Sequence, residues 1–287
     1  MRHVYLIFAS FFIISGLFGQ KQAYKIFKAN GEESYYDEMI RESSTSDVIL
    51  FGELHNNPVC HWLQLEMALN LFEKKGENLV MGAEMFERDN QLMLEEYLQG
   101  KISTRTFENQ ARLWPNYETD YKPLVEFAKE NQIEFVATNI PRRYASIIAD
   151  KGFEGLDSIN NKAYQWMAPL PMPYDPELPG YKQMTKMMGM HREPNPNMPK
   201  AQASKDATMA HFILKEKDKE NLFLHFNGTY HSNNYEGINW YLNKYMPEIE
   251  VTTIATTEQE SLEKLNNDSK NIADFILVIP SRMTKTY

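Results

Sequence analysis

Short runs of apolar and β-branched residues alternate along the chain with longer segments in which apolar positions recur at helical spacing. Such runs are typical of strands that are buried on both faces of a sheet. The predicted strands are 48–52, 79–83, 133–138, 222–226, 251–255 and 275–279. The predicted helices are 59–75, 88–98, 120–130, 142–150, 199–217 and 235–245. Strands separated by helices predict an α/β fold, a single domain whose mainly parallel central sheet is flanked by helices.

The segment 169–199 departs from this alternation. It contains eight of the fourteen prolines, and the overlapping span 167–198 contains seven of the sixteen methionines. Because proline lacks an amide hydrogen and fixes its own φ angle, this density excludes regular structure apart from a short helix near 181–190. Two interpretations stay open: a loop that packs over the sheet edge, and a lid-like insertion over a flat apolar ligand.

The first twenty residues predict a signal peptide. Arg2 is followed by an uncharged and strongly apolar run at 4–19, which is shorter than the roughly 20 residues that span a bilayer. We therefore expect residues 1–20 to be removed on export and residues 21–287 to form the mature domain. The alternative interpretation is an uncleaved N-terminal anchor.

Composition limits the class of partner. The 287 residues carry 30 Lys and Arg against 39 Asp and Glu, a formal net charge of −9. Since phosphate contacts dominate nucleic-acid affinity and no basic run is present, nucleic acid is not expected as a partner. The single cysteine, Cys60, excludes an internal disulfide and a cysteine-rich zinc site. A bound metal or cofactor would therefore rely on His, Tyr, Met or carboxylate side chains.

A Gly-X-X-His pattern occurs twice, each time directly after a predicted strand. His55 ends the first copy, which also contains Glu53, and His231 ends the second. Because ligands of parallel sheets gather beyond the carboxyl ends of the strands, we expect both histidines to line one pocket. Glu84 follows another strand and is the further carboxylate expected there. The alternative is a pair of histidines that only bond to loop carbonyls.

Five segments together resemble the ChaN-like haem-binding uptake family, which shares a superfamily with Tiki and TraB proteins and erythromycin esterases. In the family's order, they are FGELHNNPVCHWLQ (51–64), GAEMFERDNQ (82–91), ATNIPRRYA (137–145), KAQASKDATMAHF (200–212) and FNGTYH (226–231). The resemblance implies export for haem or iron uptake in the bacterial envelope, with a homodimer and outer-membrane uptake machinery as partners. Characterised members are lipoproteins, whereas no cysteine lies near residue 20 here, so we expect a soluble periplasmic protein.

For haem, the resemblance implies binding partly through tyrosine, and the Pro/Met-rich segment offers the candidates. Tyr174, Tyr181 and His191 are the candidate axial ligands. Arg143 is the candidate partner of the haem propionates. The residues that would cover the porphyrin with apolar surface are Met184, Met187 and Met188.

The superfamily also implies an alternative function, a hydrolase that is either metal-dependent or based on His and Glu. Its candidate catalytic and metal-binding residues are Glu53, His55, Glu84 and His231. A divalent ion held by them would lower the pKa of a bound water, and a remaining carboxylate would act as general base. A third interpretation is a binding or scaffolding protein without a cofactor. Of the three, we expect a haem-binding protein rather than an enzyme.

Overall fold

The computed structural model describes residues 21–189, 195–218 and 220–287. The predicted signal peptide at 1–20 and the candidate ligand His191 lie outside these residues. In the described part of the chain, no helix is long and apolar enough to cross a membrane.

Eight strands form one sheet in the order β2-β1-β8-β7-β3-β6-β4-β5. All six predicted strands are confirmed, and neighbouring members of this set run parallel. A hairpin, β1 and β2, extends one edge through antiparallel pairing of β1 with β8, which the sequence analysis did not predict. The strands are β1 (Lys25–Lys28), β2 (Glu33–Ser34), β3 (Val48–Glu53), β4 (Leu79–Glu87), β5 (Glu134–Asn139), β6 (Leu222–Gly228), β7 (Val251–Gln259) and β8 (Phe275–Pro280).

The predicted helices are also present, and two short ones, α1 and α4, were not predicted. The predicted helix at 88–98 starts with a 3-10 turn, and the one at 120–130 follows a π-helical turn at Tyr117–Tyr121. The α-helices are α1 (Tyr36–Ser43), α2 (Pro58–Lys75), α3 (Gln91–Leu98), α4 (Thr104–Gln110), α5 (Lys122–Asn131), α6 (Arg142–Lys151), α7 (Pro179–Gly189), α8 (Met198–Glu216) and α9 (Ile238–Tyr245).

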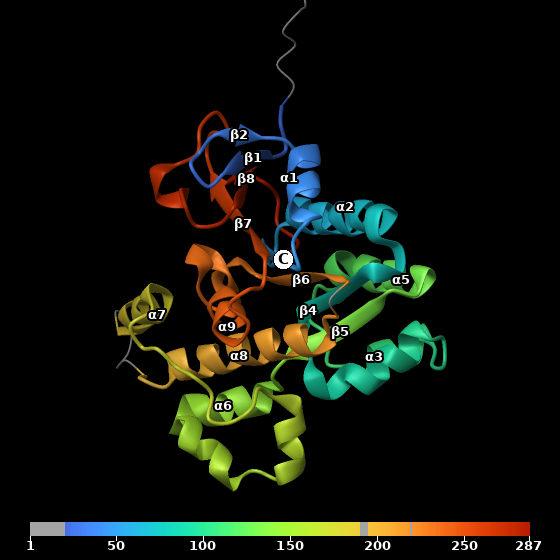
Figure 1. Cartoon of the computed structure of the whole chain (residues 1–287), viewed down its shortest axis with the longest axis vertical. Helices are drawn as coiled ribbons and strands as arrows, with labels where there is room; N and C mark the ends of the chain where they lie inside the picture. Colours follow the sequence, from blue (N-terminus) through green and yellow to red (C-terminus); the bar gives the residue numbers. More distant parts are fainter. Residues whose placement is uncertain (1–20, 190–194, 219) are drawn as a thin grey trace, which may run out of the picture.

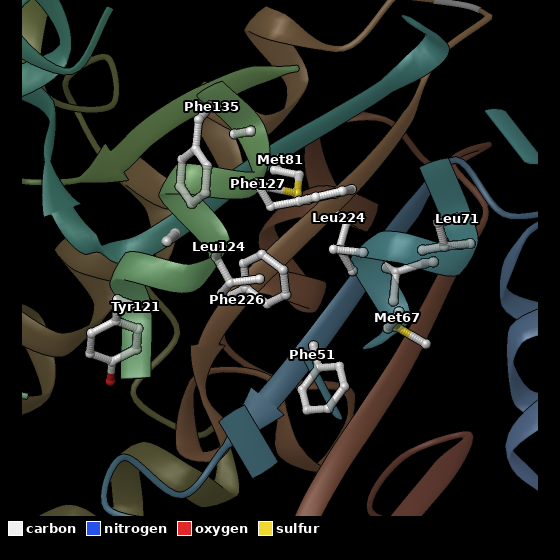
Figure 2. Packing of buried hydrophobic residues seen from close by; sticks show 14 of the residues in the cluster. Phe51, Met67, Leu71, Met81, Tyr121, Leu124, Phe127, Phe135, Leu224 and Phe226 are labelled. Atoms are coloured by element: carbon white, nitrogen blue, oxygen red, sulfur yellow. The ribbon is translucent and has the colours of Figure 1, made fainter. Parts of the chain in front are cut away.

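Helices cover both faces of the sheet (Figure 1). Side chains of β3 point alternately to the two faces, as the pleat of a strand requires. Ile49 and Phe51 enter a core shared with α2, α3 and α5, whereas Val48 and Leu50 enter a core shared with α6, α8 and α9. Figure 2 shows part of the first core, where aromatic residues of the strands pack with side chains of α2 and α5. Burial on both faces explains the uninterrupted apolar runs in the sequence.

The start of α2 fixes the chain just after the first Gly-X-X-His turn. The Asn57 side chain accepts hydrogen bonds from the backbone N–H groups of Val59 and Cys60, and Pro58 occupies the first helical turn. Both features satisfy or remove N–H groups that the helix itself leaves unpaired. The helix ends at Gly76, whose φ of 54° suits glycine. A short, well-capped connection therefore joins β3 to α2.

The Pro/Met-rich segment contains one helix, α7, close to the predicted position at 181–190. Before it, residues 167–178 form no helix or strand. Met167 and Met172 are buried in the core beside α8, and Tyr181 of α7 is 4% exposed. The described part of the segment therefore packs on the helical layer around α8, which lies beside α7 in Figure 1.

Candidate functional site

The two Gly-X-X-His turns lie side by side at the carboxyl edge of the sheet. Strands β3 and β6 are parallel neighbours, and their register pairs Glu53 with Gly228. His55 and His231 follow closely after the ends of these two strands. Both histidines, with Glu84 of β4, line a hollow of about 610 Å³ that we call the histidine cleft. The expected convergence of the two histidines at one pocket is confirmed.

Gly228 allows the two turns to approach each other. A Cβ atom at this position would lie 2.8 Å from both Cε1 and Nε2 of His55, closer than any side chain tolerates. The same Cβ atom would lie 3.4 Å from Oε2 of Glu84. That oxygen accepts a 2.7 Å hydrogen bond from the backbone N–H of Gly228. A side chain at this position would displace the imidazole of His55, so glycine allows the present contact between the two turns.

Glu53 holds the imidazole of His55. The Glu53 side chain is buried, and its Oε1 lies 2.8 Å from Nδ1 of His55. Tyr121 donates to the same carboxylate oxygen at 2.6 Å, and Gln64 donates to the other oxygen at 2.6 Å. Burial disfavours the charged imidazole, but the bond to Glu53 and the charges of Glu53 and Glu84 outweigh it and raise the pKa of His55. Nδ1 therefore carries the proton, and Nε2 is directed away from Glu53.

His61 of α2 contacts both Gln64 and the backbone of the first Gly-X-X-His turn. Its Nδ1 lies 3.0 Å from Oε1 of Gln64, and its Nε2 lies 3.0 Å from the backbone oxygen of His55. Asn116 also donates to that backbone oxygen, at 2.9 Å. His61 and Gln64 share one face of α2, as their three-residue spacing requires. They therefore position the turn and the Glu53 carboxylate.

His231 lies between two buried carboxylates. Its Nδ1 is 2.5 Å from Oδ1 of Asp206, and its Nε2 is 3.1 Å from Oε1 of Glu84. Burial alone would lower the pKa of His231, but the charges of Glu84 and Asp206 outweigh it and raise that pKa to about 10. In turn, despite its burial, the charge of His231 holds the pKa of Glu84 well below its usual range. His231 is therefore an imidazolium at neutral pH.

Of the candidate haem ligands, Tyr181 contacts this charged group, and Tyr174 packs against Tyr181. Tyr181 donates a 2.8 Å hydrogen bond to Oδ2 of Asp206, so one carboxylate joins Tyr181 to His231. Tyr174 is half-buried, and its ring centroid lies 5.8 Å from that of Tyr181 and 5.9 Å from that of Phe153. Burial raises the pKa of both tyrosines above the ordinary phenol value. Both phenols are therefore neutral at physiological pH.

The other candidates are less closely grouped. Met184 is half-buried on α7, and Met187 and Met188 belong to the same helix, but their side chains and His191 lie outside the described residues. Arg143 does not line the histidine cleft. It lines a neighbouring hollow at the start of α6 and donates to Asp89 at 2.6 Å.

The donor set does not fit the expected divalent ion. Both ring nitrogens of His231 already face carboxylates, and both oxygens of Glu53 accept side-chain hydrogen bonds. Among the described residues, no three His, Cys, Asp or Glu side chains are grouped as metal ligands. These side chains are therefore engaged with one another and do not present an open ligand set for a divalent ion. The arrangement suits instead a His/Glu site in which charge is balanced by protons.

Several site residues could not be found from the two turns alone. Asp206 lies on α8, and Tyr121 and Trp114 come from the region before α5. Only the KAQASKDATMAHF segment at 200–212 pointed to the region of Asp206. The ring centroids of Trp114 and His55 lie 4.9 Å apart, in an edge-to-face contact. These residues reach the site through tertiary packing, which leaves no local pattern in the sequence.

Comparison with solved structures gives the same fold. A structure of ChaN from Campylobacter jejuni, a protein that binds heme cofacially, matches 90% of this chain and 97% of its own with 17% identity and a TM-score of 0.66. A Bacillus cereus protein matches 90% and 95% of the two chains with 11% identity and a TM-score of 0.51. A succinoglycan biosynthesis protein matches 90% and 94% with 11% identity and a TM-score of 0.50. At these identities the likeness concerns the fold alone.

The family comparison covers most of the domain. No curated protein matches the chain. The family described as haem-binding uptake, Tiki superfamily, ChaN matches residues 39–242, which include both Gly-X-X-His turns, Glu84 and the whole of α7. This span is well over half of the 287 residues. The chain therefore belongs to the ChaN family of haem-binding uptake proteins within the Tiki superfamily.

Proposed function

We propose that this protein binds haem after export and serves haem or iron uptake in the bacterial envelope. The observation that carries the proposal is the family match over residues 39–242. The cofacial heme binding of the similar Campylobacter jejuni protein supports it. Haem is here the cargo of the protein, so binding and release are the required steps and no catalytic turnover is needed.

Tyr174 fits the role of axial ligand better than Tyr181. The Tyr181 phenol donates to the buried Asp206 carboxylate, so iron binding there would break that bond and disturb the His231 pair. The Tyr174 phenol is half-buried and has no hydrogen-bond partner among the described residues. A tyrosinate oxygen is a suitable ligand for ferric haem. Since burial and Asp175 raise the pKa of Tyr174, haem must displace a proton, and binding should strengthen as pH rises.

The apolar side chains that would pack on the porphyrin also belong to the Pro/Met-rich segment. Met184 is half-buried on α7 and offers a flexible apolar side chain on the helix that carries Tyr181. Met187 and Met188 remain predicted cover, and His191 remains a predicted second ligand. Arg143 remains the predicted partner of a propionate, which would meet it only in the hollow that it lines. Two cofacial haems would be accommodated if two copies bring their α7 regions together as a homodimer.

A hemin titration tests the haem proposal. We expect a Soret band on addition of hemin to the mature protein, and Tyr174→Phe should weaken it strongly because the axial oxygen is lost. Tyr181→Phe should have a smaller effect. The matched control is Tyr35→Phe, since Tyr35 is 70% exposed and precedes α1. A band of equal intensity in Tyr174→Phe would exclude Tyr174 as the ligand.

A second candidate, a metal-independent hydrolase, is favoured by the geometry of His55. Its Nδ1 is fixed by the buried Glu53, whereas its Nε2 has no hydrogen-bond partner among the described residues and the side chain is 37% exposed to the cleft. Neutral His55 would accept a proton from water at Nε2 while that water attacks an ester carbonyl. Lys205 lines the same cleft and would stabilise the negative oxygen that develops. When this tetrahedral oxyanion collapses, the ester C–O bond would break, and the imidazolium of His55 would return its proton to the departing oxygen.

Ester hydrolysis by purified protein tests this candidate. With 4-nitrophenyl acetate we expect a slow activity that His55→Ala abolishes and Glu53→Gln lowers at least about tenfold, since general-base and orienting contributions are of about 10²–10⁴. His211→Ala is the control, because His211 lies on α8 and does not line the cleft. Equal rates in wild type and His55→Ala would exclude His55 as the base.

A further inference from the structure

A second hollow adjoins the histidine cleft. We call it the arginine groove; it has a volume of about 920 Å³ and is lined by Arg112, Arg142, Arg143 and Trp114 with Leu113 and Glu87. Three guanidinium groups are thus gathered at one place in a chain whose formal net charge is −9. Glu87 and Asp89 pair with Arg112 and Arg143, so the groove keeps one arginine, Arg142, that has no ion pair with a described residue.

The arginines are held so that they face the groove. Asp89 forms ion pairs with both Arg112 and Arg143, and its side chain is only 9% exposed, whereas the two arginine side chains are 45–47% exposed. Asp89 thus fixes both guanidinium groups, and Arg112 also donates through Nε to Glu87 at 2.9 Å. Arg143 forms its ion pair through one nitrogen, Nη1, which leaves its other N–H donors for a ligand. Arg142 is exposed at the first position of α6 and forms no ion pair with any described residue. The positive end of the helix dipole adds to the attraction for an anion.

Trp114 joins the groove to the histidine cleft. It lines both hollows, and its ring and the His55 imidazole form an edge-to-face contact at a centroid distance of 4.9 Å. Strand β4 also passes along both, because Glu84 lines the cleft and Glu87 lines the groove. At about 3.3 Å per residue, these two positions are at most about 10 Å apart. One small molecule can therefore contact both hollows at once.

We propose that the arginine groove and the histidine cleft form one bipartite site for a small organic anion. Its carboxylate or phosphate would be bound by Arg142 and Arg143, its apolar middle would lie on Trp114, and its polar end would reach His55. Guanidinium groups suit this task because they donate paired hydrogen bonds to such oxyanions. The inference names the substrate class of the hydrolase candidate and rests on it only for the role of His55.

Binding of 4-phenylbutyrate, measured by calorimetry, tests the site without requiring turnover. We expect wild-type protein to bind this carboxylate and to bind the neutral alcohol 4-phenyl-1-butanol at least tenfold more weakly. Arg142→Gln should lower the affinity for the carboxylate about tenfold, because a charge-assisted contact is lost. Arg142 has no ion-pair partner among the described residues, so this change leaves the fold intact. Histidine-labelled protein should show a shift of the His55 imidazole signals on binding.

Arg282→Gln is the matched control, since Arg282 is exposed and follows β8, across the sheet from β5. Equal affinity in wild type and Arg142→Gln, equal affinity for acid and alcohol, or no binding of 4-phenylbutyrate would each overturn the inference. Binding is measured on haem-free protein, since Arg143 is also the predicted partner of a haem propionate and hemin is expected to compete for the groove. Tyr174→Phe should leave 4-phenylbutyrate binding unchanged, so loss of the hemin band alone contradicts the haem proposal and not this one.

Discussion

At the scale of single residues, the central feature is an imidazolium enclosed by carboxylates. His231 contacts Asp206 through one nitrogen and Glu84 through the other, and all three side chains are buried. Burial of three charges is costly unless each is paired. The pairing is completed by Tyr181, which donates to Asp206, and by the Gly228 N–H, which donates to Glu84. These paired charges therefore stabilise the fold, and two of the side chains, His231 and Glu84, also line the histidine cleft.

This pairing predicts a pH dependence of stability. The pKa of His231 rises from 6.5 to about 10 on folding, so its stabilising contribution is complete below pH 6.5 and is lost as pH increases towards 10. We expect the free energy of unfolding of wild type to decrease over this range by at least about 1.4 kcal/mol more than that of His231→Gln, since one pKa unit corresponds to that amount. Urea unfolding at pH 6.5 and pH 10 measures it. Parallel decreases in both proteins would show that His231 is not protonated in the folded state.

Some residues of the histidine cleft could be predicted from the sequence, and others could not. Glu53, His55, Glu84 and His231 were selected because each follows a predicted strand, and the structure places them around one cleft. The roles of these residues remain proposals. Asp206 lies inside the segment 200–212 that carries the family resemblance but was given no role there, because a helix position says nothing about which distant side chain it meets.

At the scale of elements, the connection between β3 and α2 is the part of the site whose local structure the sequence encodes most directly. Pro58 and Gly76 mark the ends of α2, and both are visible in the sequence. The short strand β1 has only four residues, so its pattern was too brief to distinguish from a loop. Helix α1, with eight residues, lacks a side-chain cap at its start. Short edge elements therefore depend on pairing with distant segments, which a local pattern does not contain.

The cap of α2 gives a prediction at this scale. Asn57→Ala removes the side-chain acceptor for two backbone N–H groups and a 3.0 Å hydrogen bond to Glu258. We expect a loss of about 1–2 kcal/mol in the free energy of unfolding, the usual effect of removing such a cap. Thermal or urea unfolding measures it, with Asn109→Ala on the exposed side of α4 as the control. A loss as small as that of the control would show that the cap does not fix this turn.

At the scale of the whole molecule, strand order creates the site. Strands β3, β6 and β4 are neighbours in the sheet although they are the first, fourth and second of the six parallel strands in the sequence. This order places Glu53, His231 and Glu84 next to one another at a common edge. The sequence predicted a mainly parallel sheet, but pairing order depends on crossover connections and could not be predicted. The same packing brings α7 onto α8, so the candidate haem segment and the histidine cleft share Asp206.

The most direct test of haem binding is the hemin titration of protein comprising residues 21–287, followed by absorbance and by the mass of the complex. We predict a Soret band that saturates at one haem per chain, strengthens as pH rises, and is strongly reduced in Tyr174→Phe but not in Tyr35→Phe. We also predict that haem-loaded protein is a dimer. No band in wild-type protein at stoichiometric hemin would contradict the proposal that this chain binds haem.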